Sequence, residues 1–391
     1  MKVDFNNTKN AFAYKSNLQL KKAQNIFKLM KNKSVVALGS WATKFALKIK
    51  LPINYLIRKT IFEQFCGGEN VVDSAKRIKD LEKYNVGTIL DYSSEGKDCE
   101  DAFDKTVFEI IKTIDKAKEN KSVPFSVFKV TGLARMSVLE AANKSEDNLK
   151  HEDKKKLSRI KTRINDICKY AYENNVPIFI DAEDSWIQGT IDRIAENMML
   201  LYNKKETIVF TTLQFYRWDR LDYLKELHKK SISQNYKLGI KLVRGAYMEK
   251  ERNRAVALNY IDPIQKTKEN TDNDFNLALE YCVENINDIS ICAGTHNEES
   301  SMLLIDLMHK YNIPKNDSRV YFSQLLGMSD HISFNLSKAN YNIAKYVPYG
   351  PIKEVMPYLI RRAEENSSVS SQSSRELSLI EEEIKRRKNI K

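Results

Sequence analysis

Two short segments concentrate the residues that could do chemistry. The segment "KLVRGAY" (241–247) ends an apolar run with two cations, a glycine and a tyrosine. Cations in such a turn can offset negative charge that develops during a reaction. The segment "LIRRAEENSS" (359–368) places Arg361 and Arg362 on an otherwise apolar helix, and a guanidinium is the preferred partner of a carboxylate. Because a buried cation needs an anionic partner, we expect a protein carboxylate or a carboxylate substrate.

Other polar residues follow apolar runs but are ambiguous one by one. Lys129 in "FKVTGLAR" could simply pair with a carboxylate. Asp181 in "FIDAED" could cap the next helix, and beside His296 in "GTHNEES" the better cap is Asn297. No dinucleotide or P-loop glycine motif occurs. We expect no metal site, because the other histidines occupy helical or loop contexts: His151, His228, His309 and His331.

Eight short apolar runs position these residues and alternate with charged helical segments: "VGTILDYS", "FSVFKVTGL", "VPIFIDAED", "TIVFTTLQFY", "LGIKLVRGAY", "ISICAGTHN", "RVYFSQLLG" and "NIAKYVPYG". Their number, over residues 86–350, predicts an α/β fold of the (β/α)8 barrel type, which typically takes about 250 residues. A doubly wound open sheet is the alternative. Polar residues gather toward the ends of the runs, where barrel active sites form: Asp91, Lys129, Asp181, Gln214, Lys241, Arg244, His296, Gln324 and Tyr346.

The rest of the chain reads as helical. We predict an N-terminal helical region at 1–80, the barrel at 81–368 and a C-terminal helical tail at 369–391. An apolar stripe with helical spacing runs through the N-terminal region: Leu38, Trp41, Ala42, Phe45 and Ile49. Lysines interrupt this stretch, so it is not a membrane span. We expect the stripe to pack against the barrel, with contact to an anionic membrane surface as the alternative.

Composition narrows the choice of partners and compartment. Lys and Arg outnumber Asp and Glu by 64 to 52, a net charge of +12. Mixed charges on solvated helix faces explain most of this, and we expect no nucleic-acid partner. The five cysteines form no CxxC pair, which favours a reducing compartment. Because the first twenty residues lack a signal or transit pattern, we expect a cytoplasmic protein.

Seven motifs, taken in order, make the chain resemble the proline dehydrogenase family: "VTGLAR", "IDAED", "KLVRGAY", "THNEE", "QLLGM", "YVPYGP" and "YLIRRAEENSS". The resemblance covers nearly all of residues 86–368 and is strongest to the stand-alone type of mitochondria and some bacteria. It implies FAD as cofactor, L-proline as substrate and 1-pyrroline-5-carboxylate as product. It also implies a membrane quinone as electron acceptor, with peripheral contact at the inner face of the membrane. The quinone and the oligomeric state stay open.

The resemblance also implies residue roles. The catalytic set is Lys129, Asp181 and Lys241. The substrate set is Lys129, Tyr247, Leu325, Tyr346, Arg361 and Arg362, with the two arginines on the proline carboxylate and Glu95 as a gate. The FAD set is Ala182, Gln214, Lys241, Val243, Arg244, Gly245, Ala246, Thr295, His296 and Glu365, with Thr271 as a weaker candidate. Gly245 would let the backbone approach the flavin.

Lys241 departs from the family pattern, since many bacterial members have Arg there, and a lysine lacks the planar fork. Three alternatives stay open. One is a hydroxyproline dehydrogenase, although the relatives that act on hydroxyproline have a small residue where this chain has Tyr346. The second is a barrel aldolase with a Schiff base on Lys129. The third is a non-catalytic protein that binds nucleic acid or lipid through its positive charge.

Overall fold

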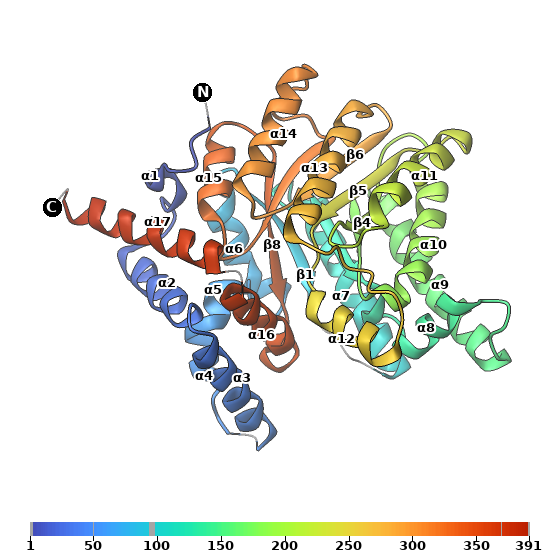
Figure 1. Ribbon diagram of the computed structural model, residues 1–391, viewed down its shortest axis with the longest axis horizontal. Coiled ribbons are helices and arrows are strands. Elements are labelled where there is room, and N and C mark those ends of the chain that lie inside the picture. Colours follow the sequence, from blue (N-terminus) through green and yellow to red (C-terminus); the bar gives the residue numbers. More distant parts are fainter. Residues whose placement is uncertain (1–2, 50, 94–97, 369, 390–391) are drawn as a thin grey trace. The chain divides into compact units, whose positions relative to one another are not determined.

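Eight parallel strands form one closed barrel in chain order (Figure 1). The computed structural model describes residues 3–49, 51–93, 98–368 and 370–389. The strands are β1 (Gly87–Tyr92), β2 (Phe125–Lys129), β3 (Ile178–Asp181), β4 (Val209–Gln214), β5 (Leu238–Val243), β6 (Ile289–Gly294), β7 (Val320–Leu325) and β8 (Ile343–Tyr349). Each lies within one of the eight predicted runs. The (β/α)8 prediction is confirmed, and the open sheet is excluded.

Helices follow the strands and cover them on the outside, as their amphipathic patterns require. They are α7 (Glu100–Glu119), α8 (Met136–Lys144), α9 (His151–Glu173), α10 (Ser185–Tyr202), α11 (Arg220–Ser233), α12 (Met248–Leu258), α13 (Lys268–Glu284), α14 (Glu298–Lys310), α15 (Asp330–Lys338) and α16 (Ile352–Ser368). Every residue of β4 and of β8 is buried, as expected for strands that are covered on both faces.

Aromatic rings fill the barrel near the beginnings of several strands. Phe125 at the start of β2 stacks on Phe179 of β3 with ring centroids 4.4 Å apart. It also meets Phe210 of β4 edge-on at 5.5 Å and Tyr321 of β7 at 4.8 Å. These contacts make that end of the barrel apolar. The polar side chains must therefore gather at the opposite, C-terminal ends of the strands.

The chain divides into two compact units, Met1–Glu95 with Gln324–Lys391, and Gly96–Ser323. The predicted split into a helical region, a barrel and a tail stays a prediction. Before β1 the described residues form helices, as predicted: α1 (Thr8–Ala11), α2 (Asn17–Met30), α3 (Lys33–Lys48), α4 (Asn54–Ile57), a π-helical turn (Arg58–Phe62), α5 (Glu63–Phe65) and α6 (Val71–Glu82). A short 3-10 turn, Val130–Gly132, follows β2.

The C-terminal tail is α17 (Ser370–Lys388), and it is docked within the first unit. Its Leu377 and Ile380 share a hydrophobic core with Phe12, Leu20 and Phe27 of the N-terminal helices. The short helix α1 and helix α2 therefore lie beside α17, although more than 300 residues separate them in the chain (Figure 1).

A buried ion cluster ties the N-terminal segment to the end of the barrel chain. Lys345 of β8 is fully buried and lies 2.9 Å from a carboxylate oxygen of Asp330, the first residue of α15. Lys15 lies 3.2 Å from the other oxygen, to which the hydroxyl of Tyr14 donates a hydrogen bond of 2.7 Å. Lys345 also donates to the main-chain oxygen of Met328. Burial raises the pKa of Asp330, but the two lysines outweigh burial and hold that pKa well below its ordinary value.

The apolar stripe of the N-terminal region does not pack as predicted. The side chains of Leu38, Trp41 and Ile49 are each at least half exposed. The buried side of α3 instead carries Val36, which joins a core with α16, and Ala46. The side of α3 that packs on α16 is therefore not the predicted one, because the core with α16 takes Val36. The Phe45 side chain is outside the described part. In the described part of the chain, no helix combines the length and the apolarity that crossing a bilayer requires.

Candidate active site

In the unit Gly96–Ser323, the carboxylate that ends β3 lies between two lysines, one at the end of β2 and one within β5. Asp181 ends β3 and is in register with Lys129, which ends β2. The Lys129 ammonium lies 3.7 Å from one oxygen of Asp181, and Lys241 of β5 donates to the other. Lys241 and Asp181 are buried, whereas Lys129 keeps 17% of its side chain exposed. Asp181 therefore orients two cations, and the alternative that it caps the next helix is wrong.

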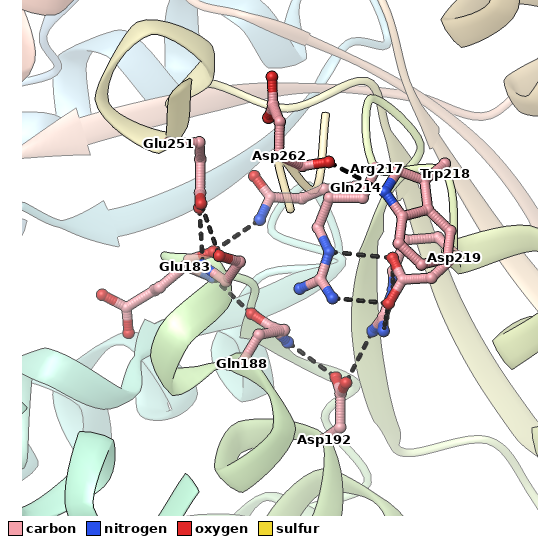
Figure 2. A network of polar contacts seen from close by, with 11 residues as sticks. Glu183, Gln188, Asp192, Gln214, Arg217, Trp218, Asp219, Glu251 and Asp262 are labelled. Atoms are coloured by element: carbon pink, nitrogen blue, oxygen red, sulfur yellow. Dashed lines mark hydrogen bonds and ion pairs between the residues drawn. The ribbon is translucent and has the colours of Figure 1, made fainter. Parts of the chain in front are cut away.

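A hydrogen-bond chain runs from the end of β4 through Glu183 to the first turns of α10 (Figure 2). The buried amide of Gln214, at the end of β4, donates to the main-chain oxygen of Glu183 at 2.7 Å. The Glu183 carboxylate accepts from the Thr131 amide at 2.9 Å and from its hydroxyl. It thereby fixes the turn that follows Lys129. Gln188 accepts from the Glu183 amide at 2.8 Å.

The same chain ends on a buried ion pair outside the strands. Gln188 donates to Asp192 at 2.8 Å, and Arg220 donates to the other oxygen of Asp192 at 2.7 Å (Figure 2). Burial raises the pKa of Asp192, and Arg220 opposes this by lowering it. Arg220 also binds Asp219, the residue before α11. These bonds leave the strand-end residues little freedom to change rotamer.

Arg244, directly after β5, is held by three partners. It donates to Asp272 at 2.6 Å, to the Thr295 hydroxyl at 2.7 Å and to the Ser300 hydroxyl at 2.9 Å. Its guanidinium also lies 4.3 Å from the ring centroid of Phe275. Burial lowers the pKa of Arg244, and the Asp272 hydrogen bond opposes this. A guanidinium has five N–H donors, and these bonds use three of them.

Gly245 is required by the protein itself. Its φ of +130° lies in a region that residues with a side chain rarely adopt, and an added Cβ would lie 2.5 Å from the ring of Tyr216. The next residues, Ala246 and Tyr247, are exposed and half-buried. They lead into α12, which is fastened to the start of α10. The amide and hydroxyl of Ser185 donate to the carboxylate of the fully buried Glu251 at 2.6 and 2.5 Å.

The remaining FAD candidates of this unit lie on the same strands or on adjoining helices. Ala182 is buried, Val243 and His296 are half-buried, and Asn297 caps α14 through the Ser300 amide at 2.9 Å, as expected. Thr271 is buried on α13, and its hydroxyl faces the main-chain oxygen of Thr267 at 3.4 Å.

The substrate candidates of the other unit lie on β8 and α16. Tyr346 is 9% exposed, and its main-chain oxygen accepts from Leu326 at 2.9 Å, whereas Leu325 is half-buried. On α16, Arg362 is buried with its guanidinium 5.4 Å from the ring centroid of Tyr358, and Arg361 is half-buried. The partial burial expected for this arginine pair is therefore confirmed.

Two predicted residues cannot be placed. Glu95, the expected gate, lies outside the described residues. Glu365 belongs to α16, but its side chain lies outside the described part.

Sequence reasoning missed the residues that hold the candidates in place. Glu183 could have been predicted from "IDAED". Asp181 was already a candidate, and side chains two positions apart on an extended chain point the same way. Asp272 and Ser300 carried no such signal, since they come from helices 28 and 56 residues away from Arg244. Only the fold brings them to the guanidinium.

Comparison with known proteins gives a consistent result. The family model described as proline dehydrogenase matches residues 74–375. "Proline dehydrogenase 1, mitochondrial" of Dictyostelium discoideum is 34% identical, covering 87% of this chain and 67% of the relative. The "carbapenem antibiotics biosynthesis protein CarD" of Pectobacterium carotovorum is 32% identical, covering 83% of each chain.

A solved structure supports the fold. The chain is similar to proline utilization A from Bdellovibrio bacteriovorus with a TM-score of 0.72 and 20% identity, covering 89% of this chain and 36% of that much longer one. Three findings agree. The fold is a barrel, the family model matches most of this chain, and the sequence is similar to several proline dehydrogenases. This chain, an oxidoreductase of proline catabolism, belongs to the proline dehydrogenase family.

Proposed function

We propose that the chain oxidises L-proline to 1-pyrroline-5-carboxylate with FAD as the hydride acceptor, and that a membrane quinone is the final electron acceptor. Family membership supports the reaction. The observation that carries the site is the Asp181 carboxylate at the end of β3. It is held between Lys129 at the end of β2 and Lys241, two residues before the end of β5. Catalytic groups of this fold come from such strand ends.

The donors after β4, β5 and β6 fit FAD. The set combines an amide, an ammonium, a guanidinium and a hydroxyl, on Gln214, Lys241, Arg244 and Thr295. An anionic diphosphate and an electron-accepting ring are best matched by cations and N–H donors fixed in advance. Arg244 meets this condition, because Asp272 and Ser300 fix its plane. When bound, FAD would supply the redox chemistry, since protein side chains supply orientation and electrostatics.

The chain's own residues then bind and orient proline. Arg361 and Arg362 hold its carboxylate through bidentate bonds, which a guanidinium forms and an ammonium does not. Asp181 orients Lys129, which assists. The proline nitrogen must be neutral, because its lone pair forms the C=N bond as hydride leaves the adjacent carbon.

Other residues shape the pocket and its surroundings. We expect Tyr247, Leu325 and Tyr346 to contact the proline ring and Glu95 to act as a gate. Glu365 would contact FAD, as would Ala182, Val243, Gly245, Ala246 and His296. The curated relatives include proteins named mitochondrial. For this chain we propose a cytoplasmic location with peripheral contact at the inner face of a membrane.

The alternatives are weaker. Membership in an oxidoreductase family removes the Schiff-base aldolase. Hydroxyproline is disfavoured as substrate because Tyr346 occupies the position at which a small residue would leave room for the ring hydroxyl.

An absorbance scan of the purified protein tests the proposal. The protein should show a flavin spectrum, and anaerobic L-proline without another acceptor should bleach the flavin band. A colourless protein that also fails to bind added FAD would remove the cofactor assignment. A yellow protein that proline does not bleach would remove the substrate assignment.

A further inference from the structure

The net positive charge of the protein comes from one segment. Residues 5–62 contain eleven lysines, one arginine and no Asp or Glu. This segment therefore carries a formal charge of +12, which equals the net charge of the whole chain. The remainder of the chain is formally neutral. Four of these cations form ion pairs with carboxylates outside the segment: Lys15 with Asp330, Lys22 with Glu63, Lys28 with Glu381 and Arg58 with Glu69. The segment still keeps a large positive excess, which attracts anionic surfaces over a Debye length.

The same segment exposes its large apolar side chains. Six of them lie on α3, on α4 and between them, with exposed fractions of 48–73%: Leu38, Trp41, Ile49, Leu51, Tyr55 and Leu56. We call these six residues the apolar face of α3 and α4. Isolated exposed apolar residues are common, but a concentration of them along one segment marks an interaction site.

The fold leaves this face outward for a clear reason. Val36 of α3 and Ile57 of α4 already join the core formed with α16, through residues such as Val355 and Leu359. The opposite side of these short helices therefore has no place in that core. The same helices carry exposed lysines, Lys33 and Lys48 on α3, and Lys59 follows α4.

We propose that the apolar face of α3 and α4 docks on the surface of an anionic lipid bilayer. Its apolar side chains would enter the boundary between headgroups and acyl chains, and the surrounding lysines would bind the headgroups. This deepens the proposed function, on which it rests for its purpose, because a quinone dissolved in a membrane requires the enzyme to reach that membrane.

Charge and apolarity together favour lipid over other occupants. A second copy of the chain would bring its own +12 segment against this one, which opposes association. Nucleic acid would use the lysines but would give the exposed leucines no apolar partner. A lipid surface satisfies both. Tryptophan and tyrosine, present here as Trp41 and Tyr55, are the side chains that favour the bilayer interface.

Vesicle sedimentation tests the proposal. The full-length protein should bind vesicles of phosphatidylglycerol and phosphatidylcholine at least about tenfold more tightly than vesicles of phosphatidylcholine alone. The triple variants Leu38→Gln/Trp41→Gln/Tyr55→Gln and Lys33→Gln/Lys48→Gln/Lys59→Gln should each weaken binding about tenfold or more. Activity with a soluble dye acceptor should not change, because all six side chains are exposed and none of the six is a candidate site residue.

Matched controls use exposed residues of the other unit. Leu201→Gln/Ile232→Gln and Lys154→Gln/Lys229→Gln remove the same kinds of side chain and should leave vesicle binding unchanged. Binding that is equal on both vesicle types, or equal in wild type and the two triple variants, would overturn the proposal. A dimer that the apolar variant dissociates, seen by light scattering, would assign the face to a second copy instead.

The same experiments distinguish failure of this inference from failure of the proposed function. A protein that binds anionic vesicles through this face but is not reduced by proline keeps the inference and loses the reaction.

Discussion

Two aspartates of this protein are each held between two lysines: Asp181 with Lys129 and Lys241, and Asp330 with Lys15 and Lys345. Around Asp330 both lysines are at least 92% buried, and the Lys345 ammonium also donates hydrogen bonds to main-chain oxygens. Around Asp181, Lys129 keeps solvent access at a strand end. The same three charges can therefore serve as an anchor or as a site, and their surroundings decide which.

The same contrast between a structural residue and a candidate site residue is found within β8. Lys345 and Tyr346 are adjacent on β8 and so point to opposite sides of the sheet. Lys345 reaches Asp330 at the start of α15, whereas Tyr346 takes the other side. One strand thus supplies a residue for stability and a residue for the proposed pocket.

The largest expected effect comes from breaking the buried cluster. Asp330→Asn leaves Lys345 and Lys15 buried without their carboxylate, so we expect the free energy of unfolding to fall by about 3–5 kcal/mol. Urea denaturation measures this loss. Replacing the buried lysine as well, in Asp330→Asn/Lys345→Met, should recover part of it.

Asp181→Asn is the matched change at the other cluster. It should cost less stability, about 1–3 kcal/mol, because it leaves one buried lysine, Lys241, without its carboxylate, whereas Asp330→Asn leaves two, and because Lys129 is already partly exposed. Its main effect should be a loss on the order of 100-fold in kcat/KM. Without the carboxylate Lys129 is no longer oriented, and a displacement of the substrate by about 1 Å can lower the rate by that factor. If the two variants lose stability equally and Asp181→Asn keeps full activity, the comparison fails.

Tyr346→Ser tests the pocket side of β8. A cavity beside the proline ring removes packing contacts, so proline turnover should fall by up to about 100-fold. The preference for L-proline over trans-4-hydroxy-L-proline should narrow. Measuring kcat/KM for both substrates decides the point, and an unchanged ratio would remove Tyr346 from the account of specificity.

Arg361→Lys and Arg362→Lys extend the comparison to α16. Each should raise the KM for proline more than about tenfold, because a point charge forfeits bidentate geometry worth on the order of 1.5–3 kcal/mol. FAD content should stay near that of the wild type. A KM that neither variant changes would place the carboxylate elsewhere.

The smallest expected effect is a difference in acid stability between the wild type and Asp330→Asn. The pKa of Asp330 is held below its ordinary value, so its contribution to stability is complete above about pH 4 and is lost as the pH falls from there toward the lowered pKa. Burial raises the pKa of the nearby Glu376, which acts in the opposite direction. Wild-type stability should therefore fall more steeply below pH 4 than that of Asp330→Asn. Equal slopes in urea titrations at several pH values would contradict this assignment.

The sequence by itself determined the barrel. Each strand is a short apolar run between amphipathic helices, and that period is local, so it can be counted in the chain without any knowledge of contacts. The motifs determined the family for the same reason, since "KLVRGAY" and "YLIRRAEENSS" are contiguous. Candidate residues such as Asp181 and Arg244 followed from their places at strand ends.

Only the tertiary structure decided what those residues touch. Asp181 could have capped a helix, but the barrel register brings Lys129 and Lys241 to its two oxygens. The buried role of Lys345 could not be predicted, because its partner Asp330 comes from α15 and Lys15, which shares that carboxylate, comes from the N-terminal segment. The apolar stripe of α3 predicted that the segment is helical, but it did not predict which side of the helix is buried. Which face of a helix is buried depends on the shape of its neighbour, and here α16 accepts Val36 and leaves Trp41 to the solvent.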